Sequence, residues 1–209
     1  MTRRVPFDII CAMLLYDSRV SGNCYKVRLL FAHLGLQYDR VELDVVDRSN
    51  RRNVIGDVNP ALRVPTVILE DGRPLAESNA ILWYFAEGTP FVPMERYEKA
   101  QVLQWQFFEQ YDHEPHVAVA RFWLLKGVAF EPAQLEARHA GGYRALDAME
   151  RHLANRSFLV GERYSIADIS LYAYTHVAGE GGFDLEPYRG VRAWLSRVAA
   201  QPGHVPIDA

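Results

Sequence analysis

The chain changes character at one short segment, Gly88-Thr-Pro-Phe-Val-Pro93, which carries two prolines and one glycine in six residues. Strand-like and helix-like patterns alternate before it, whereas only helical patterns follow it. This change predicts an α/β domain at residues 13–88, a linker at 89–93 and an all-helical domain at 94–209. Residues 1–12 precede the first predicted strand, and we interpret them as an N-terminal extension.

The first part opens with a strand, a helix and a second strand. The pattern predicts a strand at residues 13–17 and a half-buried strand at 38–45. Between them, residues 24–36 place apolar side chains at the i, i+3, i+4, i+7 spacing of a helix. Such a unit crosses over with right-handed connectivity and pairs its strands in parallel.

A hairpin and a helix complete this part. Asp71-Gly72 is a strong hairpin turn signal, and it predicts antiparallel strands at residues 64–70 and 73–76. Glu77-Ser78 then opens a helix that ends at Gly88. The polar segment 47–58 has only a weak helical signal.

The second part is predicted to contain long helices. One begins at Ser165-Ile-Ala-Asp168, where Asp168 stands at the third helical position of a capping box and indicates a structural role for both polar residues. The predicted helices cover residues 94–127, 132–155, 165–179 and 188–201.

Charge and composition exclude several classes of function. A formal net charge of −3 supplies no basic field for nucleic acid. The sequence contains no apolar run approaching the roughly 20 residues that cross a bilayer. Two cysteines, Cys11 and Cys24, are too few for a disulfide framework. We therefore expect a cytoplasmic protein without nucleic-acid or membrane partners.

Three short segments of the α/β part could hold a ligand. Ser21 and Asn23 stand where a helix begins, and the free N–H groups and dipole there favour an anion such as a thiolate. Val64-Pro65 precedes a strand as either a cis peptide that leaves Val64 free to pair with an extended ligand, or an ordinary trans edge residue. The pair Glu77-Ser78 either caps its helix or binds the ammonium and carboxylate groups of a ligand.

The order of these pieces resembles the glutathione S-transferase superfamily, in particular its serine-type, zeta-, theta- and beta-like bacterial members. Four segments carry the resemblance over nearly the whole chain: Ser21-Gly-Asn-Cys-Tyr-Lys-Val-Arg28, Asn59-Pro-Ala-Leu-Arg-Val-Pro-Thr66, Leu75-Ala-Glu-Ser-Asn-Ala-Ile-Leu82 and Phe158-Leu-Val-Gly-Glu-Arg-Tyr-Ser-Ile-Ala-Asp168. The resemblance implies a thioredoxin-like domain with a mixed four-stranded sheet, followed by an all-helical domain. It also implies a homodimer.

The family further implies how glutathione, as co-substrate, would be held. Pro65 is expected to be cis, Val64 to pair through its backbone with the cysteinyl part, and Glu77 and Ser78 to hold the γ-glutamyl end. Arg63, where the family often has Lys or Gln, either contacts the glycyl carboxylate or is solvated. No tightly bound cofactor is expected.

Two residues compete as the donor that stabilises the glutathione thiolate. Ser21 matches the serine of the serine-type classes and is the principal candidate, with the amide of Asn23 as its rival. Ser18 lies too early in the turn. Cys24 could serve a redox mechanism, but without a Cys-x-x-Cys motif we expect it to be buried and inert.

The resemblance implies that the electrophile pocket is lined from the first long helix of the second part. Tyr111, His116 and Phe122 are the candidate contacts. His113 and His116 could face a metal, but two histidines with Pro115 between them lack a third ligand, so no metal site is predicted.

The sequence therefore predicts a glutathione transferase of detoxification type that transfers the glutathione thiolate to a hydrophobic electrophile. Two alternatives stay open. One is a glutathione-dependent thiol–disulfide oxidoreductase or peroxidase, and the other is a non-catalytic interaction protein that keeps the same fold.

Overall fold

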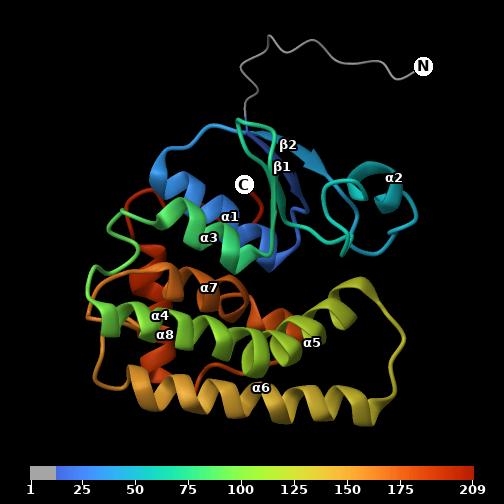
Figure 1. Ribbon diagram of the computed structural model, residues 1–209. Coiled ribbons are helices and arrows are strands. Elements are labelled where there is room, and N and C mark those ends of the chain that lie inside the picture. Colours follow the sequence, from blue (N-terminus) through green and yellow to red (C-terminus); the bar gives the residue numbers. More distant parts are fainter. Residues whose placement is uncertain (1–12) are drawn as a thin grey trace, which may run out of the picture.

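The computed structural model describes residues 13–209, in which a smaller α/β part lies against a larger helical part (Figure 1). The predicted extension at residues 1–12, which includes Cys11, lies outside the described residues.

A four-stranded mixed sheet forms the centre of the α/β part, as predicted. Its strand order is β2-β1-β3-β4, with β1 and β2 parallel and the other two pairs antiparallel. The strands are β1 (Leu14–Asp17), β2 (Asp39–Glu42), β3 (Thr66–Ile68) and β4 (Pro74–Ala76). A parallel pair extended by an antiparallel hairpin is the predicted thioredoxin-like arrangement.

All four strands are shorter than predicted, β2 and β3 by four residues each. The predicted strand 38–45 stops early since the Asp44 carboxylate accepts the N–H groups of Val46 and Asp47 at 2.6 and 3.1 Å, which closes a local turn. The predicted strand 64–70 starts only at Thr66, after the cis peptide between Val64 and Pro65. Proline has no N–H for the ladder, which accounts for the late start.

Three helices accompany the sheet: α1 (Gly22–Leu34), α2 (Arg51–Ile55) and α3 (Ser78–Ala86). Helix α1 begins two residues before the predicted start because Ser21 caps it, and it ends at Gly35 in the left-handed conformation (φ 65°). The short α2 lies in the segment with the weak helical signal.

The second part contains only helices among the described residues, as predicted. They are α4 (Arg96–Phe108), the π-helical turn η1 (Glu109–His113), α5 (Glu114–Lys126), α6 (Pro132–Leu153), α7 (Ile166–Thr175), the 3₁₀ turn η2 (Ala178–Gly181) and α8 (Arg189–Ala199).

The helix predicted at residues 94–127 corresponds to continuous helical structure over residues 96–126, but η1 interrupts its regular α-helical turns. Pro115 cannot donate a backbone hydrogen bond and its ring excludes the carbonyl of the preceding turn. The chain accommodates this with one wider turn, in which the N–H of Glu114 reaches the carbonyl of Glu109, five residues back. The predicted helix 165–179 also ends early, at Thr175, and continues as η2.

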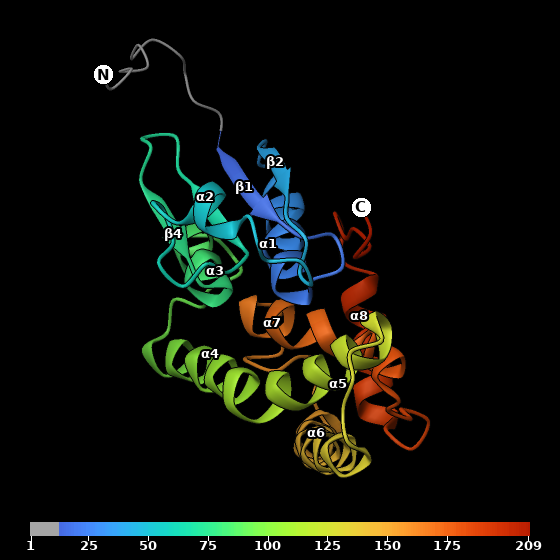
Figure 2. The same ribbon diagram turned by 90° about the vertical axis from the view of Figure 1, so that its right-hand side faces the viewer.

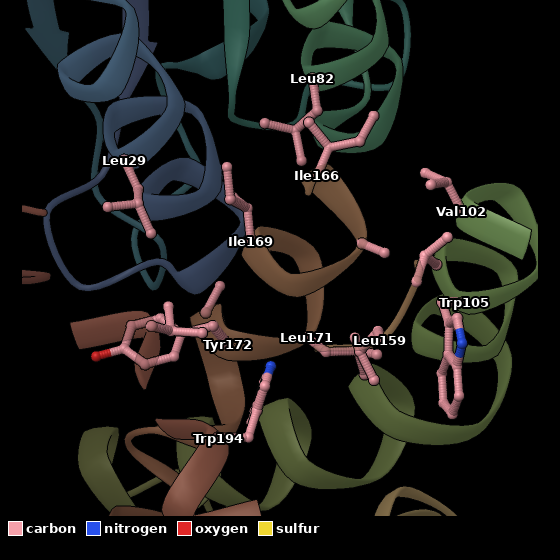
Figure 3. Close-up of a cluster of buried hydrophobic side chains, with 14 of the residues drawn as sticks. Leu29, Leu82, Val102, Trp105, Leu159, Ile166, Ile169, Leu171, Tyr172 and Trp194 are labelled. Atoms are coloured by element: carbon pink, nitrogen blue, oxygen red, sulfur yellow. The ribbon is translucent and has the colours of Figure 1, made fainter. Parts of the chain in front are cut away.

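The two parts share one hydrophobic core, and α7 lies at its centre (Figures 1 and 2). Figure 3 shows Ile166 and Ile169 of α7 close to Leu82 of α3 and Leu29 of α1. The opposite side of the cluster is built by α4 and α8 through Val102, Trp105 and Trp194, with Leu159, Leu171 and Tyr172 completing it. Burying this apolar surface holds α4 and α8 against α7, and α7 against α1 and α3.

The start of α7 is held by a buried carboxylate. Asp168 accepts hydrogen bonds from Ser165 N, Ser165 Oγ, Leu159 N and Trp194 Nε1, at 2.9 to 3.1 Å. This satisfies the predicted capping box and ties α7 to α8. Within residues 13–209, none of the helices combines the length and apolarity that a membrane span requires.

Candidate functional site

The turn after β1 carries both candidate thiol donors. Ser21 occupies the N-cap of α1 with extended backbone angles, and its Oγ accepts the N–H of Cys24 at 3.3 Å. Its other side-chain neighbour is the thiol of Cys24, a weak hydrogen-bond partner. A ligand thiolate is a stronger acceptor than that thiol, so the capping role and a donor role are compatible.

The side-chain amide of Asn23 has a fixed orientation. Its Oδ1 accepts hydrogen bonds from Lys26 Nζ at 2.8 Å and from Ser78 Oγ at 3.3 Å. Its Nδ2 donates to Glu114 Oε1 at 3.2 Å. An amide nitrogen carries two hydrogens, so one hydrogen of Asn23 Nδ2 is left for a ligand.

The loop before β3 presents Arg63, Val64 and Pro65. The Val64–Pro65 peptide is cis, as the resemblance implied. Asn59, which is buried, holds the loop by donating from Nδ2 to the Arg63 carbonyl and to Thr66 Oγ1, both at 2.9 Å. The Arg63 side chain is exposed.

Glu77 has an unusual backbone conformation at the start of α3. Its φ of 68° lies in the left-handed region, which costs a residue with a Cβ on the order of 1–3 kcal/mol. The Glu77 side chain makes no capping hydrogen bond and is exposed, while Ser78 next to it is buried. Strained residues of this kind concentrate at binding sites, because the surrounding structure maintains them for function.

Two adjoining pockets contain most of the candidate residues. The first is polar and gathers six of them: Asn23, Arg63, Val64, Pro65, Glu77 and Ser78. The second is largely apolar and contains Ser21 and Phe122 together with Val20, Val45, Ala118, Val119, Leu125 and Tyr174, with Arg121 and Lys126 also lining it. Since Asn23 and Ser21 lie two residues apart in one turn, this turn forms part of both pockets.

Sequence reasoning missed Gln110 and Glu114, which also line the first pocket. Glu114 lines the second pocket as well. In a regular α-helix, residues five apart point roughly 140° from each other. The π-helical turn changes this relation, and Glu109 and Glu114 both come to face the start of α1. The combination of Pro115 with flanking carboxylates was the sequence signal that could have indicated it.

Beneath the first pocket lies a fully buried ion pair that also escaped prediction. Lys26 Nζ is 2.8 Å from Glu109 Oε1, and both side chains are inaccessible to solvent. Asn79 and Gln110 donate to the other oxygen of Glu109, at 3.3 and 2.8 Å. A buried charge is tolerated only when it is paired and hydrogen-bonded, so this network holds η1 against α1 and α3.

The remaining candidates for the electrophile pocket lie elsewhere. Tyr111 is 77% exposed and lines neither pocket, and His116 lines neither pocket and has its ring against Gly141 of α6. Only Phe122 of the three lies in the apolar pocket. The wider π turn changes which residues of this region face α1, and it could not be read from periodicity.

His113 and Cys24 are both buried. His113 Nε2 is 3.0 Å from Thr175 Oγ1, and burial lowers the pKa of the imidazole to about 3. Its ring and that of His116 contact different helices, and no cluster of three metal-ligating side chains occurs within residues 13–209. Cys24 is inaccessible, and burial raises the pKa of its thiol far above neutrality, which opposes thiolate formation.

Comparison with known families agrees with this arrangement. The family model described as glutathione S-transferase, N-terminal domain, matches residues 20–87, and the one described as glutathione S-transferase, C-terminal domain, matches residues 105–202. A crystal structure of a glutathione S-transferase from Pseudomonas fluorescens is 49% identical in sequence and superposes with a TM-score of 0.90, covering 94% of this chain and 98% of that one. This chain belongs to the glutathione S-transferase superfamily.

Other relatives in the superfamily have diverse activities. The chain is 27% identical over 187 residues to the disulfide-bond oxidoreductase YfcG of Escherichia coli, covering 86% of this chain and 87% of that protein. It is 31% identical over 188 residues to elongation factor 1-gamma of Carassius auratus, covering 84% of this chain but only 42% of that longer protein. Membership of the superfamily therefore leaves the reaction open.

Proposed function

We propose that this protein is a glutathione transferase that binds reduced glutathione in the polar pocket and transfers its thiolate to an apolar electrophile in the neighbouring pocket. One observation carries the proposal: the turn with Ser21 and Asn23 borders both pockets, each of which it supplies with one hydrogen-bond donor. A sulfur atom at the junction of the pockets would be within reach of both donors and of the second substrate.

The polar pocket has the charges that a γ-glutamyl tripeptide needs. Glutathione carries an ammonium group and two carboxylates. In our proposal Ser78, at the N-terminal end of α3, binds the γ-glutamyl carboxylate, and Glu77 binds the ammonium group beside it. The backbone of Val64 pairs with the cysteinyl part, and Arg63 contacts the glycyl carboxylate. Phe122 and its apolar neighbours contact the electrophile.

Thiolate chemistry requires a lowered thiol pKa, which the donors would provide. A free thiol has a pKa of about 8.5, and hydrogen bonds from Ser21 and Asn23 favour its ionised form. Removing one such donor from a developing anion costs about 10²-fold or more in rate in comparable enzymes. The enzyme would thereby supply the nucleophile, and the electrophile needs only to be held against it.

Calorimetric titration with reduced glutathione tests the binding step, and a panel of aryl halides, epoxides, enones and peroxides tests the reaction. We expect saturable binding together with conjugation of at least one electrophile. Failure to bind glutathione would refute the transferase proposal. Binding without turnover across the panel would favour the non-catalytic alternative, which the similarity to elongation factor 1-gamma supports.

A glutathione-dependent disulfide oxidoreductase is the second candidate, favoured by the similarity to YfcG. In this chain it would work through the thiolate of glutathione, because Cys24 is buried and its thiol is disfavoured as an anion. Disulfide reduction that survives Cys24→Ser, with conjugation absent, is the result that would favour this candidate over transfer.

We further propose a cytoplasmic homodimer with a detoxification role. Its interface would be the apolar strip formed by Tyr84 of α3 with Leu103, Phe107 and Tyr111 of α4 and η1, whose exposed fractions run from 41% to 77%. Covering this strip with a second copy would remove apolar surface from water. A monomeric mass for the wild-type protein in light scattering would refute the dimer, and Phe107→Glu is expected to shift a dimer toward monomer.

A further inference from the structure

Glu114 is a carboxylate at the junction of the two pockets, and it is not one of the proposed thiol donors. It is the first residue of α5, directly after the π-helical turn, and it lines both the polar and the apolar pocket. Its Oε1 accepts a hydrogen bond from Nδ2 of Asn23, one of the two candidate thiol donors, at 3.2 Å. A group in this position would lie beside both the sulfur of glutathione and the electrophile.

The surroundings of Glu114 leave its carboxylate without an ion pair among residues 13–209. The ammonium group of Lys26, on α1, is engaged by Glu109 and Asn23, each at 2.8 Å. Tyr174 of α7 accepts the Asn23 N–H through its hydroxyl and lines the same pocket, and Arg63 contributes positive charge from the loop before β3.

Two features of this environment, burial and the charge of Glu109, favour proton uptake by Glu114. Burial and then the negative charge of Glu109 raise the pKa of the Glu114 carboxyl, while Lys26, the Asn23 hydrogen bond and Arg63 act in the opposite direction. The net shift is upward. A carboxylate whose pKa is raised toward the working pH is a better general base, and in its protonated form a better acid at that pH, than an ordinary surface glutamate.

We propose that Glu114 accepts the thiol proton of bound glutathione and returns it to the electrophile. This inference rests on the transferase function proposed above. In the first step the S–H bond breaks, its proton moves to a Glu114 carboxylate oxygen, and the sulfur keeps the electron pair, which leaves a thiolate and a neutral carboxyl. Ser21 and Asn23 stabilise the thiolate, and the proton stays within the site.

The second step uses the same proton when the electrophile needs one. With an epoxide, the thiolate forms a C–S bond, the C–O bond breaks, and the resulting alkoxide oxygen takes the proton from Glu114, which becomes a carboxylate again. An enone likewise needs a proton after the C–S bond forms. An aryl halide needs none, because the halide leaves with the electron pair and Glu114 releases its proton to water. The site would therefore favour epoxides and enones.

Counting protons during glutathione binding tests the first step with the wild-type protein alone. Titrations near pH 7 in buffers of different ionisation enthalpy give the number of protons released, and ultraviolet absorption gives the amount of thiolate formed. We expect substantially fewer than one proton released per thiolate, because Glu114 retains the proton. Release of one full proton per thiolate would overturn the proposal and leave the transferase function intact, whereas an absence of binding would refute that function itself.

Glu114→Gln adds a test of the second step. Glutamine can still accept the Asn23 hydrogen bond through its side-chain oxygen, but it cannot hold the extra proton. We expect proton release to rise to one per thiolate and turnover of an epoxide to fall about 100-fold, with a smaller loss for an aryl halide. Equal losses for both electrophiles, with unchanged proton release, would contradict the proposal.

Asp112→Asn is the matched control for this variant. Asp112 is an exposed carboxylate in the same π-helical turn, and it lines neither pocket. Its substitution should alter neither the proton count nor the ratio of epoxide to aryl halide turnover. If it reproduced the effect of Glu114→Gln, the effect would come from the general charge of the turn and the assignment to Glu114 would be wrong.

Discussion

Two helices of this protein begin at a serine with nearly the same cap, yet the two serines serve different purposes. Ser21 starts α1 and Ser165 starts α7, and each Oγ accepts a backbone N–H at 3.3 Å. Ser165 is fully buried, and its hydroxyl donates to Asp168. Ser21 borders a pocket, and among residues 13–209 its hydroxyl donates to no oxygen or nitrogen and has only the weak Cys24 thiol beside it. The Ser165 hydroxyl therefore donates within the protein, whereas the Ser21 hydroxyl can donate to a ligand.

The difference lies in what surrounds each cap. Asp168 receives four hydrogen bonds at the buried start of α7, so every polar group there has a partner inside the protein. At the start of α1 the acidic partner is Glu114, which reaches Asn23 from the other part of the molecule and leaves the serine uncovered. The same local sequence signal therefore marks either stability or chemistry, depending on the element packed opposite it.

The largest effect is expected when the buried cap is broken. Asp168→Asn replaces one acceptor oxygen by an NH₂ group that would face donors such as the Ser165 N–H or the Trp194 indole N–H. An unsatisfied buried donor costs about 1–3 kcal/mol, so we expect a loss of unfolding free energy of about 3 kcal/mol in urea denaturation. Turnover per folded molecule should stay near that of the wild type, and a selective loss of turnover without destabilisation would contradict the structural role.

Ser21→Ala should reduce activity more than it reduces stability. It removes the proposed thiol donor, and we expect kcat/KM for conjugation to fall about 100-fold, equivalent to about 2.7 kcal/mol. The lost cap should cost only about 1 kcal/mol of stability. Full activity in the variant would assign the donor role to Asn23, for which Asn23→Ala is the direct comparison.

Most of the architecture could be predicted from the sequence, but the different roles of Ser21 and Ser165 could not. Periodicity located the strands and helices because a half-buried surface repeats every 2 or 3.6 residues. The capping residues Ser21 and Ser165 were visible for the same local reason. Strand β2 ended early because a local turn at Asp44 competes with the ladder, and β3 started late because Pro65 has no N–H to donate.

The candidate site shows the same division between local features, which the sequence indicated, and features that depend on packing, which it did not. The short segments Val64-Pro65 and Glu77-Ser78, which the sequence proposed as ligand-binding, line the polar pocket. They could be proposed because their geometry depends mainly on their own backbone and immediate neighbours. Glu114 and the buried pair of Lys26 and Glu109 were missed, since they depend on a π-helical turn that brings residues 83 positions apart, at 26 and 109, to within 2.8 Å. Tyr111 and His116 were expected in the electrophile pocket because the family lines that pocket from this helix, and in this chain a π-helical turn interrupts the helix there.

Acid should destabilise the protein through the other end of α7. His113 bonds Thr175 there, and its imidazole has a pKa of about 3 in the folded protein against about 6.5 when unfolded. The unfolded chain therefore binds one more proton between these values, so stability falls as pH drops below 6.5, by up to about 1.4 kcal/mol per pH unit from this group. Urea denaturation gives the free energy of unfolding at each pH from 7 to 5. We expect this free energy to fall less with decreasing pH in His113→Gln than in the wild type, and an equal fall in both would exclude His113 as the cause.

The smallest effect is expected for Ser165→Ala, which sharpens the comparison because it is the same substitution as Ser21→Ala at the other cap. Alanine removes the acceptor for the Ala167 N–H and the donor to Asp168, but it keeps the Ser165 backbone N–H bond to that carboxylate. We expect a loss of about 1 kcal/mol of unfolding free energy and unchanged kcat/KM. Because Ser165 lines neither pocket, a fall in kcat/KM matching that of Ser21→Ala would mean that losing a helix cap, rather than a thiol donor, accounts for both variants.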